Sequence, residues 1–157
     1  MKSLLGIVIG LSLGLTLPAA AEPANLLGVF GNWSAFSSGS GSSLTCYALS
    51  KPRATRPAAK RGAIYLMVSD WPSRKVKAEP QIVYGYQGKE GAPAALAVGS
   101  DKFNFFIRNN GKLIDAMQSG VSAVASGTSA RGTKTSDTYS LAGFNDAMAK
   151  AHAACNM

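Results

Sequence analysis

The chain contains two cysteines, Cys46 and Cys155, which lie in its first third and at its end. Two cysteines allow only one pairing, and an even number in an exported protein argues for a disulfide. Such a bond would fix an early segment against the last one, whatever lies between them. In the chain-entropy description, closing so long a loop stabilises the folded state by about 4–5 kcal/mol. A redox pair would instead favour close spacing such as Cys-X-X-Cys, which the sequence lacks.

The first residues indicate that the protein is exported. Lys2 is followed by an uncharged run, Leu4 to Leu17, and then by Pro18 and three alanines. This pattern is typical of a cleaved secretory signal peptide, which we predict for residues 1–21. The alternative is an N-terminal membrane anchor, but the run is shorter than the about 20 apolar residues that a membrane span needs. We expect residues 22–157 to form one soluble domain in the periplasm, with the cell surface and secretion as alternatives.

The charge of the chain favours acidic partners. Its net charge is +8, and residues 1–21 contain Lys2 and no acidic residue, so +7 remains after their removal. The segment 51–77 holds a single acid, Asp70, against the bases Lys51, Arg53, Arg56, Lys60, Arg61, Arg74, Lys75 and Lys77. Such a balance suits anionic lipid, polyanionic glycan or nucleic acid, and a solvated basic face is the plain alternative. We expect the partner to be an anionic envelope component or another protein, and not a nucleic acid.

Short segments with turn signals about every ten residues predict strands. In the segment 44–50, for example, Leu44, Cys46 and Ala48 share one face, as in a half-buried strand. Asn110-Gly111 is a strong hairpin signal because both positions tolerate positive φ. The pattern predicts a β-sandwich or barrel, and we favour the sandwich. Its strands are expected over 30–36, 44–50, 64–68, 81–86, 94–98, 102–108, 112–114, 121–126 and 137–141, with one or two helical turns after Asp115.

The last segment changes from strand period to helix period at Phe144. The apolar residues then recur at helical spacing, so that one face holds Phe144, Ala147, Met148, Ala151, Ala154 and Cys155. Asp146 near the start and Lys150 further on have the order that the helix dipole favours. We expect this helix to dock its apolar face on the strands. The predicted fold class is therefore an all-β sandwich closed by one C-terminal helix.

An enzyme needs an acid–base or nucleophilic constellation, and the sequence offers little for one. His152 is the only histidine and lies one helical turn before Cys155, but a cysteine held in a disulfide cannot be a nucleophile. One histidine and two distant cysteines are also too few for a zinc site. No phosphate- or dinucleotide-binding fingerprint occurs. We expect no cofactor, no metal and no catalytic residue; an unrecognised periplasmic hydrolase or thiol-redox enzyme is the alternative.

Two polar segments are the candidate binding surfaces. The first is an exposed loop over 51–61, with the bases Lys51, Arg53, Arg56, Lys60 and Arg61. The second is a loop over 129–138, beside a turn that glycine permits, with Arg131, Lys134, Thr135, Asp137 and Thr138. Donors of this kind suit a small anionic group on a glycan, a phosphate or a peptide carboxylate. The alternative is that Asp137 and the threonines satisfy backbone groups in a turn, with Tyr139 packed below.

The segment Thr128–Phe144, TSARGTKTSDTYSLAGF, resembles the C-terminal signature of the invasion-associated locus B family of exported Gram-negative bacterial proteins. Further matching features are Cys46-Tyr47-Ala48, Arg61-Gly62, Gly85-Tyr86 and a final cysteine, so the resemblance covers residues 30–155. At Asn110-Gly111 the family usually has a longer polar stretch with a tryptophan. The resemblance implies an immunoglobulin-like β-sandwich in the bacterial envelope, with a link to host-cell invasion in some pathogenic members. It supplies no catalytic residues and no ligand. We expect a non-enzymatic periplasmic protein with a binding or envelope-maintenance role.

Overall fold

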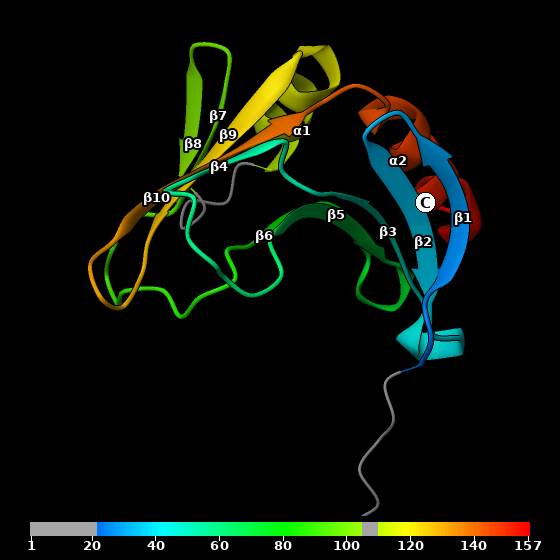
Figure 1. Ribbon diagram of the computed structural model, residues 1–157. Coiled ribbons are helices and arrows are strands. Elements are labelled where there is room, and N and C mark those ends of the chain that lie inside the picture. Colours follow the sequence, from blue (N-terminus) through cyan, green and yellow to red (C-terminus); the bar gives the residue numbers. More distant parts are fainter. Residues whose placement is uncertain (1–21, 105–109) are drawn as a thin grey trace, which may run out of the picture.

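The structure, a computed structural model, describes residues 22–104 and 110–157 (Figure 1). In this part, sheet A holds β1 (Asn25–Phe30), β2 (Trp33–Ser38), β3 (Thr45–Ser50), β5 (Tyr65–Trp71) and β6 (Val76–Val83), in that order. Sheet B has the order β4 (Ala54–Arg56), β10 (Lys134–Ser140), β9 (Ser122–Thr128), β7 (Ala95–Val98) and β8 (Asp101–Asn104). The helices are α1 (Asn110–Ser119) and α2 (Phe144–Cys155), with short 3-10 turns η1 (Gly41–Ser43) and η2 (Pro72–Arg74). The predicted class, a β-sandwich with a C-terminal helix, is confirmed.

Both sheets are antiparallel, and their inner faces share one apolar core. On sheet A, Ala35, Ala48 and Val68 are neighbours across three strands and are fully buried. On sheet B, Leu96 pairs with Ala125, and both are also fully buried. Because side chains alternate along a strand, the residues between these positions point to the outer face of each sheet.

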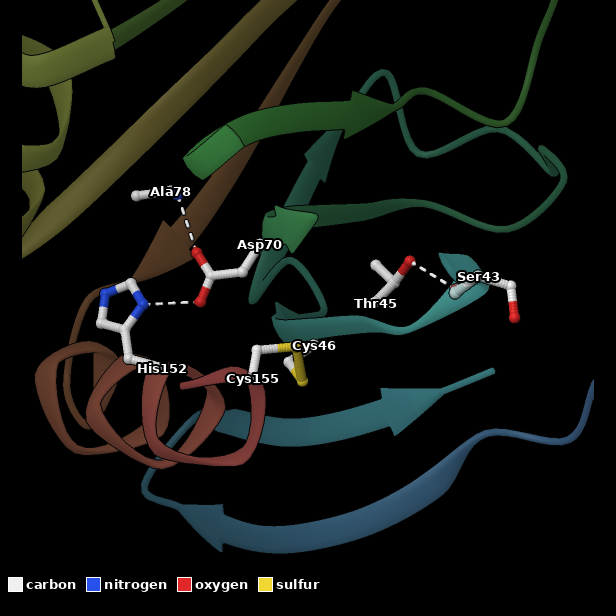
Figure 2. Close-up of a disulfide and its surroundings, with 7 residues drawn as sticks. All are labelled: Ser43, Thr45, Cys46, Asp70, Ala78, His152 and Cys155. Atoms are coloured by element: carbon white, nitrogen blue, oxygen red, sulfur yellow. Dashed lines mark hydrogen bonds and ion pairs between the residues drawn. A yellow bond between two sulfur atoms is a disulfide. The ribbon is translucent and has the colours of Figure 1, made fainter. Parts of the chain in front are cut away.

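Helix α2 packs against sheet A through β1, β2, β3 and β5. Five residues of its apolar face are buried, Cys155 among them, and the ring centre of Phe144 lies 4.9 Å from that of Trp33. The predicted disulfide joins Cys46 of β3 to Cys155 of α2, whose Cα atoms are 5.9 Å apart (Figure 2). Ala154, which we expected on the buried face, is exposed. No described helix has the length and apolar character needed to span a membrane.

The expected hairpin at Asn110-Gly111 is wrong, because these residues begin α1. The helix runs to Ser119 and buries Leu113 and Met117 at helical spacing, so the expected return strand 112–114 is helical as well. The apolar period of the whole segment outweighs the local turn preference of one dipeptide. The remainder of the expected strand 102–108, residues 105–108, lies outside the described residues.

Several strand boundaries also differ from expectation. The predicted strand 30–36 is two strands, since Gly31 and Asn32 turn the chain between β1 and β2 and Gly31 has φ +56°. The expected strand 81–86 is displaced, because β6 begins at Val76 and ends at Val83. The segment predicted as a basic loop contains β4, which pairs with β10. Strands β1 and β4 were missed because neither alternates clearly in hydropathy.

Candidate functional site

Parts of the two candidate polar segments meet at a cleft of about 390 Å³, which we call the basic cleft. One wall comes from the chain before β5, a second from the segment after β6, and a third from the turn between β9 and β10. In Figure 1 these loops lie together on the left, below the label β10. The lining residues are Pro57, Ala59, Lys60, Arg61, Tyr86, Gln87, Ser129, Ala130, Arg131, Thr133 and Thr135.

The base of the basic cleft contains a buried ion pair between Arg61 and Asp137. The guanidinium donates to both carboxylate oxygens of Asp137, with Nη1 3.1 Å from Oδ2, and also to the carbonyl of Tyr84 at 3.2 Å. The side chain of Arg61 is 7% exposed and that of Asp137 is fully buried. The hydrogen bond with Asp137 raises the pKa of Arg61, so the guanidinium stays charged across the physiological range.

Two tyrosines connect this ion pair to sheet B. The hydroxyl of Tyr84 donates to the carbonyl of Ser126 at 2.9 Å, and that of Tyr86 lies 2.6 Å from Thr135 Oγ1. The two rings stack with centres 5.5 Å apart. They pass directly over Gly127, where a Cβ would come within 2.7 Å of the Tyr86 hydroxyl. Glycine at position 127 is therefore required for the tyrosines to reach the strand.

Main-chain contacts set the position of Arg61 and of the β9–β10 turn. The amide of Gly62 donates to the carbonyl of Gly85 at 2.9 Å, and Gly85 has φ +71° in a place where a Cβ would lie 2.6 Å from the Gly62 oxygen. The amide of Ala130 donates to the carbonyl of Gln87 at 2.8 Å. Three segments distant in sequence are thus joined by backbone hydrogen bonds around the cleft, which makes it a preformed site.

The electrostatics of the basic cleft are set by Lys60 and Arg131. Both residues are exposed, and no salt bridge in the described ranges involves either of them. Because Asp137 already neutralises Arg61, these two cations give the cleft its net positive charge. Tyr86 also lines the cleft, and Arg61 Cζ lies over its ring, 5.7 Å from the ring centre. The cleft can therefore receive an anionic oxygen group through charge-assisted hydrogen bonds.

The remaining predicted site residues lie elsewhere or have another role. Lys51, Arg53 and Arg56 are exposed outside the cleft, and Lys134 lines a neighbouring hollow with Lys102. Residues 134–136 of the predicted loop belong to β10, which begins before the expected strand 137–141. Thr135 and Asp137 point inward from it, and Thr138 is half-buried. Asp137 is paired with a side chain rather than with turn backbone, and Arg61 is buried rather than exposed. Tyr139 is buried, as expected.

A second buried carboxylate, Asp70, lies under α2 at the other end of β5. Its Oδ1 accepts the amide of Ala78 at 2.8 Å, and its Oδ2 lies 2.6 Å from His152 Nδ1 (Figure 2). In the register of sheet A, Asp70 of β5 pairs with Cys46 of β3, so the disulfide lies directly beside the Asp70–His152 pair. The sequence did not reveal the pair because Asp70 and His152 lie on a strand and a helix that are 82 positions apart in the chain. Both cysteines form the disulfide, so neither is a thiolate nucleophile in this state.

The sequence analysis also missed the tyrosines and the wall formed by Gln87 and Ala130. The only available signal was the alternation of Tyr84 and Tyr86, which we interpreted as part of a strand. Within residues 22–104 and 110–157, no cluster of three or more metal-binding side chains occurs. Comparison with known proteins finds no matching family model, no similar curated protein and no similar solved structure.

Proposed function

We propose that this protein is a non-enzymatic binding module of the bacterial envelope and that its basic cleft holds an anionic group of an envelope component. The observation that carries the proposal is the meeting of Lys60 and Arg131 over a buried Arg61–Asp137 pair. Charged oxygens of a phosphate, sulfate or carboxylate fit such donors, because hydrogen bonds between charged groups are shorter and stronger than neutral ones.

Two features, the first residues of the chain and the disulfide, support export to the envelope. The first 21 residues have the features of a signal peptide. The Cys46–Cys155 disulfide fits an oxidising compartment, of which the periplasm is the one we propose, with the cell surface and secretion as alternatives. We also propose membership of the invasion-associated locus B family on the strength of the run RGTKTSDTYSLAGF, whose residues contribute Arg131, Thr133 and Thr135 to the cleft. A role in host-cell invasion would be a further property of some members.

The test is a titration of the protein with tripolyphosphate as a compact anionic probe. Replacing both Lys60 and Arg131 by alanine should weaken binding by at least about tenfold per residue, the effect of losing a hydrogen bond to a charged group. The matched control is Lys51→Ala with Arg53→Ala, which removes the same charge from outside the cleft. Binding should also weaken as salt is raised. Equal loss in both double variants would show that only the overall charge matters and would overturn the proposed site.

The Asp70–His152 pair favours one competing function, a hydrolase in which the carboxylate orients the imidazole as a general base. The two functions separate through His152→Gln. If the protein is a binding module, this variant binds tripolyphosphate as the wild type does. If it is a hydrolase, hydrolysis of ester or peptide substrates by the wild type would be detectable and would disappear in the variant. Detectable hydrolysis lost with His152 would replace the binding module by the enzyme.

A further inference from the structure

The end of the β5–β6 hairpin that lies away from the basic cleft carries a second group of cations. Arg74, Lys75 and Lys77 are all exposed, and no salt bridge in the described ranges involves any of them. The Arg74 guanidinium carbon lies 4.2 Å from the ring centre of Trp71, which is half-exposed. Three cations without a salt bridge thus lie within six positions of one half-buried tryptophan, and we call these four residues the tryptophan tip.

Asp70 and Glu79, the two acidic residues of the β5–β6 hairpin, are already engaged. Asp70 is fully buried and faces His152 and the Ala78 amide. Glu79 accepts a hydrogen bond from the side chain of Asn110 at 2.6 Å. Lys75 has φ +52°, a conformation that turns the chain sharply between η2 and β6 and keeps its side chain at the end of the hairpin. The cations are therefore available to an external anionic surface.

The outer face of sheet A continues from the tryptophan tip and carries aromatic and apolar side chains, with Ser34, Ser69 and Gln81 between them. The register pairs Tyr47 with Phe36, and their rings stack with centres 5.3 Å apart. Leu49 pairs with Met67 on the same face, since Ala48 and Val68 point inward. At the β1 edge, the outward-facing Leu26 and Val29 are 54% and 65% exposed. Helix α2 packs on the opposite face, where it contacts the inward-pointing Cys46 and Asp70.

An aromatic and apolar surface bordered by cations fits the boundary of an anionic bilayer. Tryptophan prefers the level of the lipid headgroups because its ring is apolar and its N–H is polar. Each lysine or arginine near an anionic leaflet multiplies the affinity about fivefold. A hydrated polyanion would use the cations but would gain nothing from the uncharged face beside them. The two features together favour a membrane surface over a soluble polyanion.

We propose that the tryptophan tip docks the protein on the surface of an anionic lipid bilayer, with the outer face of sheet A next to the headgroups. The basic cleft then lies at the far end of the hairpin. Strand β5 begins at Tyr65, shortly after Arg61, and spans about 20 Å before Trp71. Figure 1 shows the two ends well apart, with the β5–β6 turn close to η1. Bilayer docking at one end would leave the cleft open to a second ligand.

Binding to vesicles tests this docking directly. Residues 22–157 contain both sheets and both helices, so a chain starting at Glu22 retains the fold and lacks the apolar run 4–17. The vesicles contain phosphatidylglycerol with phosphatidylethanolamine, or phosphatidylcholine alone. Trp33 is fully buried and Trp71 is the chain's other tryptophan, so a change in emission reports on Trp71. We expect co-sedimentation and a blue shift with the anionic vesicles, both weakened by salt, and neither with phosphatidylcholine.

Two triple variants provide the decisive comparison. Replacing Arg74, Lys75 and Lys77 by serine should lower the affinity for anionic vesicles about 100-fold, whereas replacing Lys51, Arg53 and Arg56, which lie outside the basic cleft, by serine should lower it far less. Trp71→Ser should weaken binding without removing a charge. Circular dichroism and thermal melting confirm that each variant is folded. Equal loss in both triple variants, an unchanged Trp71 emission, or equally tight binding to soluble polyphosphate would overturn bilayer docking.

Discussion

Two carboxylates, Asp137 near the basic cleft and Asp70 under α2, are buried away from water, and the cost of burying them is offset in different ways. Both are fully buried on inward-facing strand positions, and each has one basic side chain as its partner. The partner of Asp137 is an arginine, which is always charged, whereas His152 is charged only when protonated. The Asp70 end has a covalent bond beside it, and the Asp137 end has only noncovalent contacts. We infer that the ion pair is essential at the cleft and secondary beside the disulfide.

The largest expected effect on stability comes from removing the disulfide that holds α2 near Asp70. Replacing Cys46 and Cys155 by alanine should lower the free energy of unfolding by about 4–5 kcal/mol, because the unfolded chain is no longer constrained. Chemical denaturation measures this loss. Amide exchange should accelerate mainly in α2, while affinity for tripolyphosphate stays near that of the wild type. A comparable loss of affinity would show that the two ends are not independent.

Breaking the ion pair at the cleft should cost nearly as much. Arg61→Met leaves Asp137 charged and buried, which should destabilise the protein by about 3–5 kcal/mol in denaturation experiments. The matched control, Lys60→Met, changes an exposed cation and should have little effect. Adding Asp137→Leu to Arg61→Met should restore much of the stability, since no unpaired charge then remains. No recovery in this double variant would contradict the central position of the pair.

Removing the imidazole should have a smaller effect. His152→Ala leaves Asp70 with the Ala78 amide as a donor and with the disulfide holding the helix, so the expected cost is about 1–3 kcal/mol. His152→Gln keeps a side-chain donor and should cost less. The greater importance of the cleft ion pair is supported if both His152 variants lose less stability than Arg61→Met under the same conditions. A larger loss of stability for His152→Ala than for Arg61→Met would contradict the inference that the Asp70–His152 pair is secondary.

Alkaline pH should weaken the cleft end. Burial raises the pKa of Tyr84 and of Tyr139, with further increases from Tyr86 and Asp137 for the first and from Asp137 for the second. Above about pH 10 these phenols ionise in the unfolded chain but stay protonated in the folded one, so stability falls as pH rises. The expected total loss between pH 9 and pH 11 is about 1.4 kcal/mol for each tyrosine, measured by denaturation. A flat profile across this range would contradict the burial of both rings.

The smallest expected changes in stability come from removing the hydroxyl of Tyr84 or of Tyr139 near the basic cleft. Tyr84→Phe removes the hydrogen bond to Ser126 and should cost about 1 kcal/mol. The Tyr139 hydroxyl is buried and has no hydrogen-bond partner among the described residues, so Tyr139→Phe should leave stability unchanged or raise it slightly. Thermal melting of the two variants side by side measures the difference. A clear loss in Tyr139→Phe would indicate that its hydroxyl is satisfied.

The parts of the fold that the sequence predicted are those where one face of an element is buried. Cys46 and Ala48 alternate in β3, and Phe144, Ala147 and Met148 recur in α2, so both elements and the disulfide were foreseen. These patterns are local in the sequence, because a period of two or 3.6 residues follows from the geometry of each element.

The candidate site was predicted only in part, because its pairing is not local. Thr135 and Asp137 are polar residues that point into the core, so their strand resembled a loop. Asp137 tolerates burial only through Arg61, which is 76 positions away. Asn110 carried a hairpin signal, but the packing of Leu113 and Met117 decides for a helix. Composition indicated a basic protein, and only the fold brought Lys60 and Arg131 to one cleft.

The most direct test of the basic cleft is a residue-by-residue map of anion binding in the wild-type protein. Backbone amide signals would be followed by nuclear magnetic resonance during titration with tripolyphosphate in physiological salt. We expect saturable shifts at Lys60, Arg61, Gln87 and the 129–133 turn, with little change over 51–56. Shifts of similar size over all exposed basic residues, or shifts that leave out Lys60 and Arg131, would contradict the account.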